Sequence, residues 1–127
     1  MKALLSVKPE YAEKIFTREK RFEFRKVCFK ESIQTVIVYA TMPVGKIIGE
    51  FDIEFVLKDS PNRLWEKTKE YAGIPMEYFH EYFSGRDVGY AIKIKEVRRY
   101  QKGKDPYEDD IDFTPPQSFR YIKERVA

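Results

Sequence analysis

Charged residues alternate with phenylalanines in the segment Lys20-Arg21-Phe22-Glu23-Phe24-Arg25. Because side chains of a strand point alternately to its two faces, this spacing predicts a strand with its aromatics in the core and its charges on the opposite face. Arginine can hold a phosphate, and a carboxylate can accept a hydrogen bond from a base edge. The charged face is therefore a candidate ligand site, and a solvated edge strand is the equal alternative.

A second polar element, Ser6-Val7-Lys8-Pro9, ends a short apolar strand expected over residues 2 to 7. Pro9 suits the first turn of a helix, and the next apolar residues have helical spacing. These apolar positions are Tyr11, Ala12, Ile15 and Phe16. Ser6 is then either part of the ligand site or a cap of this helix.

Further elements follow from periodicity and from proline and glycine positions. The apolar run over residues 35–40 predicts a central strand, and alternation over 46–57 and 88–95 predicts two half-buried strands, with a bend at Gly49. Helices are expected from Ser60-Pro61 to Gly73 and from Pro75 to Gly85.

Charges and prolines over residues 100–116 predict a long loop, and residues 119–122 predict a last strand. Five or six strands with about three short helices indicate an α+β fold, a small mixed β-barrel with helical caps.

The composition is that of a globular protein. The chain has 127 residues, of which 43% are hydrophobic and 16% aromatic, so we expect a single domain over residues 1–127. The net charge is only +3, but charge is uneven: residues 1–30 and Arg98 to Lys104 are basic, whereas Asp105 to Asp112 is acidic. Local basic patches decide binding to polyanions.

The sequence indicates a cytoplasmic protein. It has neither a signal-peptide core nor an apolar run near the roughly 18 residues of a membrane span. Cys28 is the single cysteine, which favours a small buried side chain in a reducing compartment. The 35% charged content with few amide residues resembles the composition of thermophile proteins.

Several catalytic classes are excluded by residue content. A zinc site needs three or four ligands, and one Cys and one His are present, so we expect no metal. His80 lies among aromatic residues, where a structural role is expected, and no nucleophile elbow accompanies it. The scattered glycines form no nucleotide-binding loop, so we expect no cofactor.

These motifs resemble the ASCH domain of the PUA-like superfamily of small β-barrels. Ser6-Val7-Lys8-Pro9 is similar to the family's Ser-hydrophobic-Lys-Pro element, and Lys20 to Arg25 is similar to its Gly-x-Lys-x-x-Glu-hydrophobic-Arg element. Residues 48–53 resemble its hydrophobic-Gly-Glu strand, and residues 115–121 resemble a C-terminal element of single-domain archaeal and bacterial members. Arg18 replaces the family's glycine, and a left-handed conformation costs a non-glycine residue about 1 kcal/mol, which argues against such a turn here.

The resemblance implies a cleft beside the first helix where RNA or a nucleotide-like ligand binds. The residues that it implies for this cleft are Ser6, Lys8, Lys20, Glu23, Arg25, Gln117, Ser118 and Arg120. Tyrosines such as Tyr11, Tyr100 and Tyr121 are candidates for stacking on bases. Glu23 and Arg25 have a structural alternative, which is to pair with each other or with charges on a neighbouring strand.

An enzyme is the alternative to a binding module. Some ASCH-like proteins resemble amidohydrolases that deacylate modified cytidine with a lysine, a threonine and a glutamate. Lys20 matches the lysine, but Glu23 occupies the threonine position, so we expect no such activity. Lys20 and Glu23 are the catalytic candidates of this alternative, with the carboxylate as general base toward water and Lys20 as its electrophilic partner. Other members resemble ribonucleases, for which Glu50 or Asp52 could hold a metal.

A third class is a structural or regulatory protein. It would be favoured if the acidic residues Asp105 to Asp112 filled the charged face. The sequence leaves the oligomeric state open.

Overall fold

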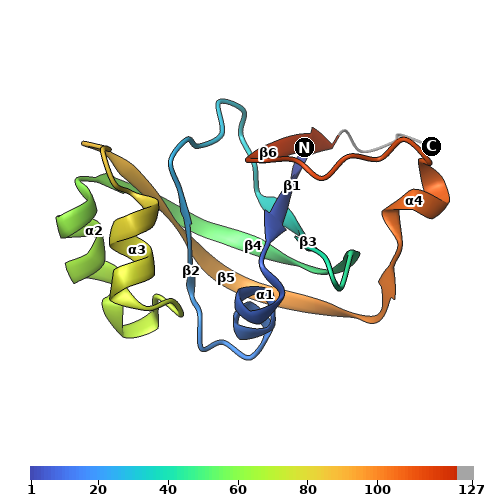
Figure 1. Ribbon diagram of the computed structural model, residues 1–127, viewed down its shortest axis with the longest axis horizontal. Helices are drawn as coiled ribbons and strands as arrows, with labels where there is room; N and C mark the ends of the chain where they lie inside the picture. Colours follow the sequence, from blue (N-terminus) through green and yellow to red (C-terminus); the bar gives the residue numbers. More distant parts are fainter. Residues whose placement is uncertain (123–127) are drawn as a thin grey trace.

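The computed structural model describes residues 1–122 as a curled six-stranded sheet with helices at its two ends and along one side (Figure 1). The elements in chain order are β1 (Lys2–Val7), α1 (Pro9–Phe16), β2 (Phe22–Arg25), β3 (Thr35–Ala40), β4 (Lys46–Asp59), α2 (Pro61–Thr68), the 3-10 helix η1 (Lys69–Tyr71), α3 (Met76–Tyr82), β5 (Gly89–Lys104), α4 (Pro106–Asp109) and β6 (Phe119–Ile122). This arrangement is an α+β half-barrel, which confirms the predicted fold class.

The strand order across the sheet is β2-β5-β4-β3-β1-β6. Strands β1 and β3 pair in parallel and the remaining pairs are antiparallel, so the sheet is mixed. Three register shifts interrupt the long β4–β5 pair, and such bulges bend and twist a strand. One of them lies beside Gly49, where a Cβ atom would come within 2.6 Å of the Arg98 carbonyl oxygen and of the Phe16 ring.

Two apolar clusters hold the helices to the sheet. The first packs α1, through Ala12 and Ile15, against buried residues of β1, β3, β4 and β5. The second packs Phe22 and Phe24 of β2 against α2 and α3, with the Phe24 and Phe79 rings 5.0 Å apart at nearly a right angle. The aromatic face of residues 22–24 is therefore core, as predicted.

The prediction of a loop over residues 100–116 is wrong for residues 100–104, which belong to β5. Strand β5 continues to Lys104, because its charged residues pair with β4 up to the Ile47–Lys104 match. Helix α4 follows, with Pro106 in its first turn and the Asp105 carboxylate accepting a hydrogen bond from the Tyr107 amide at 2.9 Å. Phe113 then packs on the Tyr39 ring, which fixes the acidic segment to the sheet end farthest from α3 (Figure 1).

Arg18 also differs from the expectation. Its φ of 69° lies in the left-handed region, so the turn exists despite the missing glycine. Its guanidinium donates a hydrogen bond to the Ile94 carbonyl at 3.3 Å, which offsets part of the backbone cost. Within residues 1–122, none of the helices is long and apolar enough to span a membrane.

Candidate functional site

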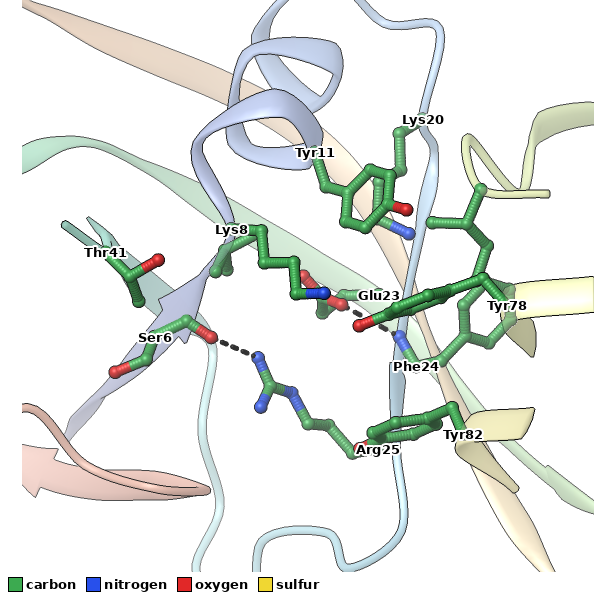
Figure 2. A pocket seen from close by; sticks show the side chains of 12 residues that line it. Ser6, Lys8, Tyr11, Lys20, Glu23, Phe24, Arg25, Thr41, Tyr78 and Tyr82 are labelled. Atoms are coloured by element: carbon green, nitrogen blue, oxygen red, sulfur yellow. Dashed lines mark hydrogen bonds between the residues drawn. The ribbon is translucent and has the colours of Figure 1, made fainter. Parts of the chain in front are cut away.

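A cavity of about 210 Å³ lies where β1, the start of α1, β2 and α3 meet. We call it the Lys20 pocket (Figure 2). Its charged lining residues are Lys8, Lys20, Glu23 and Arg25, and its aromatic ones are Tyr11, Phe24, Tyr78 and Tyr82. Ser6, Val7, Thr41 and Ile74 complete the lining. Sequence elements separated by up to 76 positions, Ser6 to Tyr82, thus meet around one cavity.

Lys20 forms the inner wall of this pocket and is only 1% exposed. The left-handed turn at Arg18 precedes it, and its amide donates to the Lys14 carbonyl at 3.0 Å. Its Nζ donates to the Ala72 carbonyl at 2.9 Å and lies 4.8 Å from the centre of the Phe24 ring. Burial lowers the pKa of Lys20 to about 8, although the nearby Glu23 carboxylate favours the charged form.

Gly73 makes room for this lysine. Its φ is +69°, and a Cβ atom at this position would come within 2.3 Å of the Lys20 Cβ. The glycine that ends the second predicted helix therefore also lets the chain after η1 approach Lys20. The Ala72 carbonyl that receives the Nζ hydrogen bond belongs to the same tight turn.

Glu23 is 7% exposed and Arg25 is 8% exposed, so the charged face is buried rather than solvated. The Glu23 Oε1 atom accepts a hydrogen bond from the Phe24 amide at 3.1 Å. Its Oε2 atom and the Arg25 Nε atom are buried and have no hydrogen-bond partner among residues 1–122. The alternative in which Glu23 pairs with Arg25 is not seen in this part of the chain, where Arg25 instead donates to backbone carbonyls.

Arg25 joins three segments. Its Nη2 donates to the Ser6 carbonyl at 2.9 Å, and its Nη1 donates to the Ser118 carbonyl at 3.4 Å. The Ser6 hydroxyl donates to the Pro116 carbonyl at 2.8 Å, so it does not cap α1. These contacts hold residues 116–118 beside β1 and β2.

Two lysines lie over tyrosine rings of α3: Lys8 belongs to the lining of the Lys20 pocket, whereas Lys26 does not. The Lys8 Nζ lies 4.6 Å from the centre of the Tyr78 ring, and the Lys26 Nζ lies 4.7 Å from that of Tyr82. Lys8 and Lys26 are exposed. The two tyrosines are four residues apart on α3 and therefore share one face of it. Figure 2 shows the Lys8, Glu23 and Arg25 side chains converging in front of these rings.

Other residues considered from the sequence lie elsewhere. Gln117 and Arg120 are exposed and do not line the Lys20 pocket, and the Arg120 guanidinium lies 5.2 Å from the centre of the Phe113 ring. Arg21 is turned away as well, with its guanidinium 4.0 Å from the centre of the Tyr71 ring. Of the three tyrosines named, Tyr11 lines the pocket, whereas Tyr100 donates to the Glu50 carboxylate and Tyr121 accepts backbone hydrogen bonds.

The carboxylates of Glu50 and Asp52 each accept a hydrogen bond from the Arg98 guanidinium at 2.7 Å. The hydrogen bonds that Asp52 accepts from Arg98 and Thr35 lower its pKa to about 2. Over residues 1–122, no cluster of three potential metal ligands is present. The acidic segment is likewise absent from the pocket lining, and Asp109 pairs with Lys104 at 2.9 Å.

The sequence interpretation missed Tyr78, Tyr82 and Thr41. Both tyrosines are close in sequence to His80, which is exposed and lies against the Trp65 and Phe79 rings. Their four-residue spacing, offset by one from the buried pair Phe79 and Phe83, was the available signal for a second aromatic face. No pattern in the sequence indicated Thr41.

Comparison with known proteins identifies relatives over most of this chain. A model of the ASCH domain matches residues 5–109. Two proteins of Ureaplasma parvum are similar: one named ATP synthase subunit alpha is 33% identical over 122 residues, and large ribosomal subunit protein uL22 is 30% identical over 121. The matched region covers 94% of this chain, but only 15% and 39% of those proteins.

An ASCH domain-containing ribonuclease of Zymomonas mobilis is 27% identical over 124 residues, which are 95% of this chain and 84% of that protein. The crystal structure of ASCH from Zymomonas mobilis matches with a TM-score of 0.89 at 25% identity, over 97% of this chain and 88% of that one. The N-terminal domain of Staphylothermus marinus McrB has a similar fold, with a TM-score of 0.52 and 15% identity over 89% of this chain and 80% of that one.

Proposed function

The chain belongs to the ASCH domain family, and on this basis we propose that it binds single-stranded RNA and takes one nucleotide of the strand into the Lys20 pocket. The observation that carries the proposal is the combination of buried charge and aromatic rings in one cavity. Proteins recognise single-stranded RNA by stacking bases on aromatic rings while cations follow the backbone. The pocket holds three cations and one carboxylate among four rings.

The size of the pocket favours a single nucleotide. Its volume of about 210 Å³ is below the roughly 300 Å³ at which drug-sized sites begin. A single nucleotide unit suits a cavity of this size, and its neighbours in the strand would lie outside it. Lys8, an exposed cation of the pocket lining, supports the proposal because it could bind a phosphate of such a neighbouring nucleotide.

Fluorescence anisotropy with a labelled ten-nucleotide single-stranded RNA tests this proposal. We expect Tyr78→Ala to weaken binding by about 1–3 kcal/mol through loss of a stacked base. Lys8→Ala should reduce the slope of log affinity against log salt by about 0.7, the value for one phosphate of a single strand. Lys69→Ala is the matched control, because Lys69 is an exposed lysine of η1 that lies outside the pocket and pairs with Glu66. Unchanged affinity in both pocket variants would contradict the proposal.

Ribonuclease activity is the second candidate, and the name of the Zymomonas mobilis relative favours it. Cleavage through the 2′-hydroxyl needs a base for its proton and an acid for the leaving oxygen. Glu23 would be the base, and Lys20, whose pKa is lowered to about 8, would be the acid. Gel electrophoresis of the same RNA after incubation decides this candidate: Lys20→Met and Glu23→Gln should each abolish cleavage.

A further inference from the structure

An open groove of about 410 Å³ lies at the end of the sheet where β2 and β4 end and β5 begins. We call it the Lys58 groove. Its lining combines three cations and one carboxylate with a tyrosine, a valine and a glycine, which are Lys26, Lys58, Arg86, Asp87, Tyr90, Val88 and Gly85. The proposed RNA site leaves these residues without a role.

The pairing of three strands places this groove next to the Lys20 pocket. Arg25 of β2 pairs with Tyr90 of β5, and Tyr90 pairs in turn with Lys58 of β4. Residues directly opposite each other on antiparallel strands share one face of the sheet. Arg25 lines the pocket, whereas Tyr90 and Lys58 line the groove, so the two sites are neighbours on the same face.

Tyr82 forms the boundary between the two sites. Its side chain lines the Lys20 pocket, and the Lys26 Nζ lies 4.7 Å from the centre of its ring. Lys26 follows Arg25 directly in sequence and lines the groove. Arg86 lies on the turn after α3, where its amide donates to the Phe83 carbonyl at 3.0 Å. A strand that leaves the pocket across Tyr82 therefore enters a groove lined by cations.

The three cations of the groove have no anionic partner in the described part of the chain. Lys26, Lys58 and Arg86 are exposed, and none of them forms an ion pair within residues 1–122. Farther along β5, Arg98 is instead paired with two carboxylates of β4. The groove lining has three positive charges against the one negative charge of Asp87, so it favours an anionic ligand.

The charge at the opposite end of the sheet favours the same direction for the strand. The acidic segment Asp105 to Asp112 lies at the end farthest from α3, whereas the Lys58 groove adjoins the turn that follows α3 (Figure 1). Carboxylates repel phosphates, and unpaired cations attract them. A polyanion that occupies the Lys20 pocket is therefore attracted toward the groove and repelled from the acidic end.

We infer that the Lys58 groove binds phosphate groups of the RNA strand whose nucleotide occupies the Lys20 pocket. This inference rests on the proposed RNA-binding function. Lys26, Lys58 and Arg86 would contact phosphate oxygens, and the Tyr90 ring would provide an apolar surface for a sugar or base between them. The ligand is then a single strand of several nucleotides, not a free nucleotide.

The experiment measures binding of a labelled ten-nucleotide single-stranded RNA by fluorescence anisotropy over a range of salt concentrations. The double variant Lys58→Ala/Arg86→Ala should bind about tenfold more weakly at low salt. Its slope of log affinity against log salt should fall by about 1.4, twice the value for one phosphate of a single strand. The matched control is Lys46→Ala/Lys102→Ala, which removes two exposed cations from a groove beside α4. Equal slopes for the two double variants would overturn the inference.

A substitution with the opposite expected effect distinguishes loss of binding from loss of fold. Asp87→Asn removes the carboxylate that repels phosphate in the groove, so it should strengthen binding about threefold at low salt. Glu108→Gln is the matched control, because Glu108 is exposed and lines the groove beside α4. Asp87→Asn that binds no more tightly than Glu108→Gln would overturn the inference.

Failure of this inference and failure of the proposed function give different results. If Tyr78→Ala weakens RNA binding while the groove variants bind as their controls do, RNA occupies the Lys20 pocket and only the inference is overturned. If the unmodified protein does not bind the RNA, both are overturned.

Discussion

The Arg25 guanidinium donates a hydrogen bond to the carbonyl of Ser6 at 2.9 Å, across 19 positions of sequence. Strand β2 lies at one edge of the sheet and β1 lies near the other edge, so this contact closes the open side of the half-barrel. It also sets one wall of the Lys20 pocket, because both residues line it.

We expect Arg25→Ala to destabilise the protein by about 2–3 kcal/mol, because it removes charge-assisted hydrogen bonds to the Ser6 and Ser118 carbonyls. The sequence pattern predicts Arg25 on the charged face of the strand, and the structure buries that face. Urea unfolding measures the change. Arg86→Ala, at an exposed position, should stay within about 0.5 kcal/mol. Equal effects of the two substitutions would contradict a structural role for Arg25.

Replacement of Phe22 by alanine should cost about 3–5 kcal/mol, as for other buried aromatic residues. Phe22 is 7% exposed in the cluster with α2 and α3, whereas Phe55 on β4 is 45% exposed and provides a matched control. We expect Phe55→Ala to cost no more than about 1 kcal/mol. Thermal unfolding of both variants checks this, and a similar loss in both would mean that residues 22–25 have the opposite register.

Lys20 should make stability rise with pH. Its folded pKa of about 8 lies below the unfolded value of about 10.4, so the unfolded chain binds more protons between these values. Below about pH 8 Lys20 is charged in both states, and burial of its charge lowers the free energy of unfolding by the full amount. This loss shrinks as the pH rises toward 10.4, because the buried amine is then neutral. We expect the free energy of unfolding to gain about 2 kcal/mol from pH 7.5 to pH 10, relative to Lys20→Met.

Tyrosines that titrate in the same pH range affect the unmodified protein and Lys20→Met alike. The difference between their free energies of unfolding therefore reports Lys20 alone. Parallel pH profiles for the two proteins would show that Lys20 keeps an ordinary pKa.

Arg18→Gly and Arg18→Ala should differ in stability by about 1 kcal/mol in favour of glycine. Both variants lose the hydrogen bond to the Ile94 carbonyl, but only glycine adopts a φ of 69° without strain. Differential scanning calorimetry of the two variants provides the comparison. Equal melting temperatures would indicate that alanine moves the turn out of the left-handed region.

No release of cytidine from acetylated cytidine is expected. The position of the family's threonine is occupied by Glu23, and a carboxylate is a poor nucleophile toward an amide. Chromatography of the nucleoside after incubation with the pure protein gives the answer, with Lys20→Met as the control. Release that depends on Lys20 would favour the hydrolase instead of the binding module.

Periodicity was sufficient to predict most of the strands and helices, because apolar residues repeat every two or about every four positions in them. It failed for β5 beyond Lys95, where charged residues and Gly103 resemble a loop. That part of the strand exists because β4 provides a partner along its length. Pairing between distant segments overrides local composition here.

The site could be predicted only in part. The alternation around Glu23 placed the charges of β2 on one face, but burial of that face depends on α3 and on residues 116–118, which are distant in sequence. The sequence does not indicate that Tyr78 lines the Lys20 pocket, because α3 is also distant in sequence from β1 and β2. Arg18 shows a further limit, because tertiary contacts stabilise a backbone conformation that its residue type disfavours.

The contacts of Ser6 and Arg25 with Pro116 and Ser118 reach past residue 109, where the ASCH model match ends. Strand β6 lies in the same stretch and pairs with β1. Transfer of only the matched residues into another chain would remove the partner of the Ser6 hydroxyl and one of the two carbonyls that Arg25 binds. The segment of this chain that must be moved as one module is thus longer than the residues that the ASCH model matches.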